Sequence, residues 1–348
     1  MQNIPHSRPT FDAEFERAAA QVIQSQQLAQ GEATTRLEKH ISQALGLPHT
    51  LAVDSGTSAL MLAIRGLTQG KTKPRVGIPS LACASLLFAV KAANAEPVFM
   101  DCSVDLTLDA EQAFAIANTL DILVLVHPFG MVEPLAAQTF PCPVIEDIAQ
   151  SVGATLDGKP VGSFGDICMG SLYATKPWGA AYGGFIASHQ HPLISTITSM
   201  VNPDAAHIHA EYVGHHQLSN IHAALASVRI RQADKTQQQR GQWAEKYDAV
   251  LSNLDATPIK SSAKSVGNDF RYIVRSEQHA NIVIQQLRDR GIGASKPIQQ
   301  PLHHTHSATL CPQASLAWQH CISLPLLADM ADIEFHQIQQ GMQACFHF

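Results

Sequence analysis

A lysine in a polar loop is the residue of this sequence best suited to covalent chemistry. Lys176 stands five positions after Ser171 and is followed by the glycine pair at 183–184. A lysine amine attacks a carbonyl only after it loses its proton, and burial near other groups lowers a lysine's pKa enough to allow this. The pattern indicates an amine that forms a Schiff base. Taken alone, however, such a lysine is far more often a solvated surface residue.

An acidic residue ends a predicted buried strand upstream of this lysine. Residues 121–127 and 143–147 each form an apolar run with a polar end, and such strand ends carry the chemistry of open α/β sheets. Asp147, three residues before Gln150, could pair with a protonated pyridine nitrogen, the partner that a pyridoxal cofactor needs as an electron sink. Asp147 could instead be the N-cap of a helix over residues 148–151.

A hydroxyl-rich turn precedes both residues. Ser55-Gly56-Thr57 follows a short apolar run and opens an amphipathic helix that extends to Leu67. Backbone N–H groups and a hydroxyl at a helix N-terminus can bind an anion such as phosphate, although the same residues are also ordinary capping sequence. A phosphate turn, a strand-end acid, a hydroxyl and a lysine thus follow one another in the order that a pyridoxal phosphate site requires.

These residues and further motifs resemble a known enzyme family. The chain is similar, over essentially its whole length, to the DegT/DnrJ/EryC1/StrS sugar aminotransferases, which are fold-type-I pyridoxal phosphate enzymes. The segments that carry the resemblance are Ser55–Leu60, Pro79, Ala95–Asp101, Val126–Gly130, Glu146–Gln150, Gly162–Asp166, Ser171–Lys176, Ala223–Ala224, Gly291–Ile292 and Ser323–Pro325.

The resemblance implies a role for each residue of the candidate site. Lys176 would hold the cofactor as a Schiff base and move a proton between the substrate carbon and the cofactor. Asp147 would keep the pyridine nitrogen protonated, and Gln150 would contact the ring hydroxyl. The implied phosphate ligands are Gly56, Thr57 and Ser171. Some members of the family have histidine in place of this lysine and catalyse a dehydration, so Lys176 favours transamination.

Three positions depart from the family pattern. Cys83 stands where the family has an aromatic ring stacked on the cofactor, and a thiol can still cover the ring face with less area. His215 and Gln217 stand where the family tends to have an asparagine, which reaches the phosphate of the neighbouring subunit's cofactor, and an arginine. Tyr182 replaces a glutamate before the glycine pair. We expect Cys83 and His215, or its neighbour His216, to contact the cofactor.

Composition limits the class of protein. The chain has 348 residues, 45% hydrophobic content and a formal net charge of -6, and it contains no basic run, which argues against nucleic acid as a partner. Its seven cysteines are scattered and odd in number, as expected for reduced thiols in the cytoplasm. No signal peptide and no apolar stretch long enough to span a bilayer are recognisable, so we expect no membrane partner.

The order of predicted elements indicates an α/β fold. Residues 11–46 have helical spacing with an interruption near Gln30-Gly31, and strands alternate with helices from about 50 to 190, as in a doubly wound, mostly parallel sheet. We expect one long helix over 218–252, then a strand at 270–274 and helices at 280–290 and 333–344. The predicted domains are a large pyridoxal-phosphate-binding domain at 1–235, with an N-terminal helical arm, and a small C-terminal α/β domain at 236–348.

Eighteen histidines raise the question of a metal site. The closest groups are His303, His304 and His306 on one loop and His207 and His209 on another, but their spacing matches no zinc motif. We therefore expect no metal. The resemblance instead puts His303 near the sugar side of the active site, where it could contact a hydroxyl or phosphate.

The sequence as a whole predicts a homodimeric aminotransferase with shared active sites and pyridoxal 5'-phosphate as cofactor. Its expected small-molecule partners are a keto sugar, in particular a nucleotide-linked one, and glutamate as amino donor. Two alternatives stay open. One is amination of a cyclitol or another ketone without a nucleotide, and the other is a non-catalytic protein that binds pyridoxal phosphate.

Overall fold

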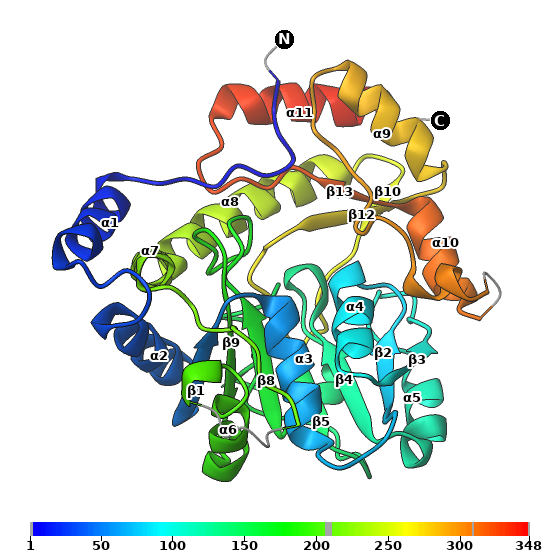
Figure 1. The fold of residues 1–348 in the computed structure, drawn as a ribbon. Helices are drawn as coiled ribbons and strands as arrows, with labels where there is room; N and C mark the ends of the chain where they lie inside the picture. Colours follow the sequence, from blue (N-terminus) through cyan, green and yellow to red (C-terminus); the bar gives the residue numbers. More distant parts are fainter. Residues whose placement is uncertain (1–2, 206–210, 308–309, 347–348) are drawn as a thin grey trace.

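A large sheet and a smaller one organise the fold. The computed structural model describes residues 3–205, 211–307 and 310–346. Figure 1 shows the large sheet in the lower half, surrounded by helices, and the smaller sheet with its own helices above it. Both ends of the chain lie in that upper part (Figure 1).

The elements alternate as predicted. The α-helices are α1 (Ala13–Ser25), α2 (Glu32–Leu45), α3 (Gly56–Leu67), α4 (Ala84–Ala92), α5 (Ala110–Ile116), α6 (His191–Thr198), α7 (Asn220–Arg231), α8 (Ala233–Leu251), α9 (Ala280–Asp289), α10 (Pro312–His320) and α11 (Asp332–Cys345). The strands are β1 (His49–Val53), β2 (Arg75–Pro79), β3 (Glu96–Met100), β4 (Ile122–Val126), β5 (Val144–Asp147), β6 (Thr155–Leu156), β7 (Lys159–Pro160), β8 (Ile167–Ser171), β9 (Gly184–Ser188), β10 (Ala256–Pro258), β11 (Ser265–Val266), β12 (Tyr272–Ser276) and β13 (Cys321–Leu324).

The large sheet has the strand order β1-β9-β8-β5-β4-β2-β3. The pairs β2–β3, β2–β4, β4–β5 and β5–β8 are parallel, whereas β9 runs antiparallel to both of its neighbours. The prediction of a doubly wound, mostly parallel sheet is therefore confirmed. In such a sheet the carboxyl ends of the parallel strands lie along one edge, where ligands bind.

Strand β4 illustrates why these strands are continuously apolar. Val124 packs in a cluster with side chains of α3, α4 and α6, whereas Leu123 and Leu125 pack in a second cluster with side chains of α2 and α7. Successive side chains of a strand point to opposite faces of the sheet. A strand that is buried on both faces must therefore be apolar at every position.

The smaller sheet contains β10, β12 and β13 in antiparallel order. Its core also includes side chains of α9, α11 and the second half of α8, among them Tyr247 and Leu251. Ile4 belongs to the same core, and its backbone N–H donates to the oxygen of Gly291 over 2.8 Å. We keep the division into domains at 1–235 and 236–348 as a proposal. Ile4, however, lies in the first of these ranges and packs in the core of the second.

The single long helix predicted over 218–252 is wrong, because the chain forms α7 and α8 there. Gln232 separates them with φ −93° and ψ 0°. Its backbone N–H is shared between the oxygens of Val228 and Arg229, at 3.2 and 3.1 Å, so the regular helical bonding ends at this residue. Neither glycine nor proline marks the break, and helical spacing alone did not reveal it.

Candidate active site

A cavity of about 260 Å³ lies where the carboxyl ends of β4, β5 and β8 meet the N-terminus of α3. The predicted site residues that line it are Gly56, Thr57, Cys83, Asp147, Gln150, Ser171 and Lys176. Tyr182 also lines it. Segments more than a hundred residues apart in the sequence thus supply one site, because the parallel sheet brings its strand ends to the same edge.

The N-terminus of α3 has the geometry of an anion site. Ser55 is the N-cap, and its Oγ accepts the backbone N–H of Ser58 over 3.1 Å. A Cβ at Gly56 would lie 3.0 Å from Cβ of Ser171, so glycine is what allows β8 to approach the turn closely. Capping therefore does not exclude anion binding, since Gly56, Thr57 and Ser171 still border the cavity.

Asp147 is a buried carboxyl with one oxygen already bonded. Its Oδ1 accepts the backbone N–H of Ala149 over 2.9 Å. Residues 148–151 form turns and not a helix, so the N-cap alternative is wrong. Burial raises the pKa of Asp147, although Lys176 opposes that rise. Its Oδ2 makes no hydrogen bond within the described ranges of the chain. The carboxyl can therefore accept a hydrogen bond from a protonated ring nitrogen in the cavity.

Lys176 is half-buried beside this carboxyl and is not a solvated surface residue. Burial lowers the pKa of Lys176, and the positive charge of Arg271 adds to that effect, whereas Asp147 opposes it. The Nζ atom lies 5.3 Å from the centre of the Phe270 ring. A lowered pKa increases the fraction of unprotonated amine, which is the form that attacks a carbonyl.

Gln150 is oriented by backbone groups. Its Oε1 accepts the N–H of Phe129 over 3.3 Å, which leaves the amide nitrogen to serve the cavity as a donor. Asn268 holds the same segment, because its Nδ2 donates to the backbone oxygens of Gln150 and Val152 over 3.0 and 2.9 Å. Sequence reasoning missed Asn268, which lies in a loop over a hundred residues away and belongs to no pattern.

Cys83 borders the cavity, as its alignment with a cofactor-stacking position suggested, and Tyr182 borders it as well. Cys83 is exposed and directly precedes α4. Tyr182 is exposed, and its ring centre lies 5.5 Å from that of Tyr173. Both side chains are accessible from the cavity, so neither departure from the family pattern blocks it.

The segment around His215 lies beside the phosphate turn of its own chain. Gln217 bridges to Val53, the last residue of β1. His216 is already bonded through both ring nitrogens: Nδ1 lies 3.2 Å from Oδ2 of Asp54 and Nε2 lies 2.7 Å from the hydroxyl of Tyr212. His216 is therefore held in its own chain. His215 is exposed, does not line the cavity, and remains the predicted contact for a neighbouring subunit.

His303 is not positioned to contact a ligand in this cavity, contrary to our expectation. It is fully buried, with Nδ1 2.5 Å from Oγ of Ser80 and Nε2 3.2 Å from Oγ of Ser315.

Within the ranges that the structure describes, histidine, cysteine and carboxylate side chains form no cluster suited to a metal ion. His207 and His209 lie outside those ranges. No helix in them is long and apolar enough to cross a membrane.

The fold is that of a fold-type-I pyridoxal phosphate enzyme. A sequence model of the DegT/DnrJ/EryC1/StrS aminotransferase family matches residues 9–343, so this chain belongs to that family. It is an aminotransferase, and the cofactor of its family is pyridoxal 5'-phosphate.

Solved structures with the same fold include several members of this family. An aminotransferase of the family from Brucella abortus shares 23% identity and a TM-score of 0.86, over 96% of this chain and 95% of that one. A protein of Streptococcus pneumoniae assigned as a sugar aminotransferase, in its PLP-form, shares 21% identity and a TM-score of 0.88, over 99% and 98%. The GDP-4-keto-6-deoxy-D-mannose-3-dehydratase of E. coli shares 14% identity and a TM-score of 0.85, over 98% and 100%.

Proposed function

We propose that this enzyme transfers an amino group from glutamate to the ketone of a nucleotide-linked keto sugar. The observation that carries the proposal is the pairing of a lysine of lowered pKa with the buried carboxyl of Asp147 in one cavity that a helix N-terminus also borders. The sugar class is supported by two proteins of the same fold: one is assigned as a sugar aminotransferase, and the other is named for a GDP-linked keto sugar.

The residues that line the cavity have the chemistry to hold pyridoxal phosphate and to assist its reaction. The cofactor, when bound, supplies an electron sink for the bond changes at the substrate carbon. Lys176 would bind it covalently, and Nζ would then move a proton between the substrate carbon and the cofactor. Asp147 keeps the ring nitrogen protonated, and its burial strengthens that interaction.

The remaining cavity residues position the cofactor. The first N–H groups of α3, with Thr57 and Ser171, would bind the phosphate, because an anion is stabilised at the positive end of the helix. The amide of Gln150 would donate to the ring hydroxyl. Cys83 would cover one ring face.

We further propose a homodimer in which His215 reaches the phosphate site of the other subunit. The side chain of His215 is exposed and makes no hydrogen bond with the described part of its own chain. Imidazole can donate to a phosphate in either protonation state.

We also propose a cytoplasmic location, which is supported by the seven cysteines, all of them described and all of them free thiols.

Reduction with borohydride tests the covalent step. The purified protein should be yellow with cofactor, and reduction followed by peptide mapping should place the label on Lys176. The variant Lys176→Ala should show no label. The control variant Lys159→Ala, which changes an exposed lysine, should be labelled like the parent. A label on another lysine would refute the assignment.

A half-reaction screen tests the substrates. Glutamate should convert the cofactor to its amine form with loss of visible absorbance, and a nucleotide-linked keto sugar should restore that absorbance. Restoration by free cyclitol ketones alone would establish the alternative substrate class. Inertness to every amino donor would mean that the protein binds the cofactor without catalysis.

A further inference from the structure

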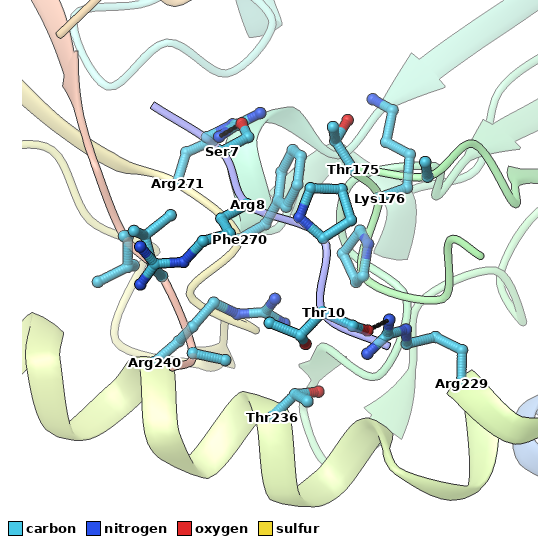
Figure 2. Close-up of a pocket in the computed structure, with 16 residues that line it drawn as sticks. Ser7, Arg8, Thr10, Thr175, Lys176, Arg229, Thr236, Arg240, Phe270 and Arg271 are labelled. Atoms are coloured by element: carbon cyan, nitrogen blue, oxygen red, sulfur yellow. Dashed lines mark hydrogen bonds between the residues drawn. The ribbon is translucent and has the colours of Figure 1, made fainter. Parts of the chain in front are cut away.

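A second, smaller cavity of about 60 Å³ lies on the other side of the Lys176 loop. The N-terminal segment at 7–10, the loop at 174–177, helices α7 and α8, and the chain before β12 surround it. Figure 2 shows the side chains of Arg229 and Arg240 extending toward Thr10, whereas that of Arg271 extends toward Ser7. Phe270 and Lys176 also line it, and Lys176 lines the larger cavity as well, so the smaller cavity adjoins the candidate active site.

The three arginines lack the carboxylate partners that buried guanidinium groups require. Among the residues that the structure describes, no acidic side chain forms an ion pair with Arg229, Arg240 or Arg271. Arg8, which lines the same cavity, differs, because it pairs with Asp329 and with Glu334 at 3.1 and 2.8 Å. A buried charge is strongly unfavourable unless it is paired, so the three positive charges point to an absent anion.

Hydrogen bonds to backbone oxygens and to a hydroxyl hold two of the arginines in place. These bonds use only some of the N–H donors of each guanidinium group. Arg229 donates from Nε to the oxygen of Gly179 over 3.1 Å and from Nη2 to the oxygen of Thr10. Arg271 donates from Nη1 to Oγ of Ser7 over 2.7 Å. A guanidinium has five N–H donors, and both groups therefore keep several that are not used.

Arg240 is the member of the cluster with an orphaned buried donor. Its Nε is buried and has no hydrogen-bond partner in the described structure. Asp269 lies near enough to act on it electrostatically without forming an ion pair. An unsatisfied buried donor is unfavourable, and a bound acceptor would satisfy it.

The electrostatics of the cluster agree with this geometry. Burial lowers the pKa of Arg240 to about 10, and the charge of Arg229 contributes to that shift while Asp269 opposes it. Burial also lowers the pKa of Arg271 to about 10, with a contribution from Arg240. The charge of Arg229 therefore disfavours the charged form of Arg240, and the charge of Arg240 disfavours that of Arg271, and a bound anion would oppose both effects.

We propose that this cavity binds a small oxyanion, a carboxylate or a phosphate group, beside the guanidinium groups of Arg229 and Arg240, with Arg271 at the border of the cavity. Planar guanidinium groups match the paired oxygens of both anions. The volume exceeds the roughly 10–15 Å³ that one water needs, but it is far too small for a sugar. Because Arg271 acts on Lys176 electrostatically, the anion would also reduce the positive field at the reactive amine. This site does not depend on the proposed reaction.

Calorimetric titration of the cofactor-loaded protein tests the site directly. Potassium phosphate and sodium propionate are titrated separately at constant ionic strength, so that the two sources of oxyanion are distinguished. One molecule of at least one of them should bind per chain. Arg240→Gln should weaken that binding about tenfold or more, because it removes a charged donor from a bond worth more than 1.4 kcal/mol. Arg17→Gln, the same change at an exposed arginine, should leave the affinity unchanged.

Thermal unfolding supplies a second readout that a merely structural arginine would not produce. Without oxyanion, Arg240→Gln should melt at or above the temperature of the parent, because it removes a positive charge that burial disfavours. With oxyanion, the parent should become the more stable of the two. Arg240→Lys, which keeps the charge but loses the planar fork, should bind with intermediate affinity and guards against a glutamine variant that does not fold.

Two results would overturn the proposal: no binding of either anion to the parent, or equal binding to the parent and to Arg240→Gln. If the protein retains no cofactor, the proposed function fails by itself, and the cavity can still be tested in the cofactor-free protein. Phosphate bound at the α3 turn is then recognised because Thr57→Ala removes it, whereas phosphate bound at the arginine cavity is removed by Arg240→Gln.

Discussion

Two adjacent carboxyl groups on β5 have opposite electrostatic environments. Burial disfavours the charge of Glu146, but hydrogen bonds from His127 and from backbone N–H groups outweigh it and lower the pKa of Glu146. Burial prevails at Asp147 and raises its pKa. Neighbouring side chains of a strand point to opposite faces, so one carboxyl faces the cavity and the other faces the turn at 162–165.

Glu146 therefore has a structural role that can be measured. Its two oxygens accept the N–H groups of Gly162, Phe164 and Gly165 at 2.8, 2.7 and 2.6 Å. In Glu146→Gln an amide nitrogen replaces one acceptor and meets these donors, so the free energy of unfolding should fall by about 1–3 kcal/mol. Urea denaturation measures the change, and Glu16→Gln at an exposed position should show none.

Substitution of the neighbouring Asp147 should reduce the reaction rate and leave the stability nearly unchanged. Asp147→Asn keeps the shape and the oxygen that accepts the N–H of Ala149, so stability should be nearly unchanged. Loss of the charge should slow the glutamate half-reaction by about 10²–10³. If Asp147→Asn reacts at the parent rate, or if Glu146→Gln is as stable as the parent, the division of roles between the two carboxyls is wrong.

At the scale of elements, the loop that carries Lys176 depends on a tight turn. The N–H of Lys176 donates to the oxygen of Tyr173, and the N–H of Gly179 donates to the oxygen of Lys176, both over 2.8 Å. A Cβ at Gly179 would lie 1.8 Å from the oxygen of Tyr173, a distance that no side chain can adopt. The turn therefore requires glycine at 179.

Gly179→Ala should displace the loop. We expect a loss of stability of about 1–3 kcal/mol, as for other overpacked sites, and weakened retention of pyridoxal phosphate, measured by thermal unfolding and by absorbance after dialysis. Gly241→Ala in α8 is the matched control, because its added methyl meets only the end of the Asp269 side chain at 3.3 Å. A variant at 179 that melts and retains cofactor like the parent would show that the loop relaxes without cost.

The N-terminal segment is a second element with a measurable contribution. His6 lies between Ser295 and Ser323, with Nε2 at 3.1 and 2.9 Å from their hydroxyl oxygens. Burial, with contributions from Arg271 and Arg288, lowers the pKa of His6 from 6.5 to about 3. Docking of this segment onto the C-terminal part therefore requires the neutral form of His6.

This requirement makes stability depend on pH. Between about pH 6.5 and pH 3 the unfolded chain binds a proton at His6 that the folded chain does not, so the free energy of unfolding falls as the pH falls. The slope from this residue is at most about 1.4 kcal/mol per pH unit. His6→Gln should lose stability less steeply than the parent over that range in urea titrations, and His336→Gln, at an exposed site, should follow the parent. Parallel curves for His6→Gln and the parent would contradict this account.

At the scale of the whole molecule, the cavity gathers the predicted ligands with the exception of His215. The side chain of His215 is exposed and could therefore contact a second subunit in a dimer with shared sites. Both ring nitrogens of His216, in contrast, already lie within hydrogen-bond distance of Asp54 and Tyr212. Of the two histidines predicted to contact the phosphate site of the other subunit, only His215 therefore remains as the candidate.

Mixing two inactive or weak variants tests this arrangement. A dimer formed from one Lys176→Ala subunit and one His215→Ala subunit contains one site without either change, so activity should exceed that of either variant alone. Mixing Lys176→Ala with Lys176→Ala, His215→Ala should restore nothing. A fully active monomer in solution, or a His215→Ala variant that holds the cofactor as tightly as the parent, would refute the shared site.

The sequence was sufficient for the features that depend on local pattern. Apolar runs separated by helices predicted the parallel sheet, and Ser55-Gly56-Thr57, Asp147 and Lys176 were recognisable because strand ends and helix starts have characteristic residues. These signals are short-range, since they reflect the backbone preferences and periodicity of a few neighbouring residues. The break at Gln232 escaped because it carries no such signal.

Only the tertiary structure decided which distant residues meet. It buried His303 between Ser80 and Ser315, and it placed Arg229, Arg240 and Arg271 on the lining of one cavity, with no ion-paired carboxylate among the residues that the structure describes. Burial and charge pairing depend on how elements pack, and no spacing along the chain records them. The sequence by itself thus determined the fold class and the candidate chemistry, whereas packing determined each side chain's partners and the direction of its pKa.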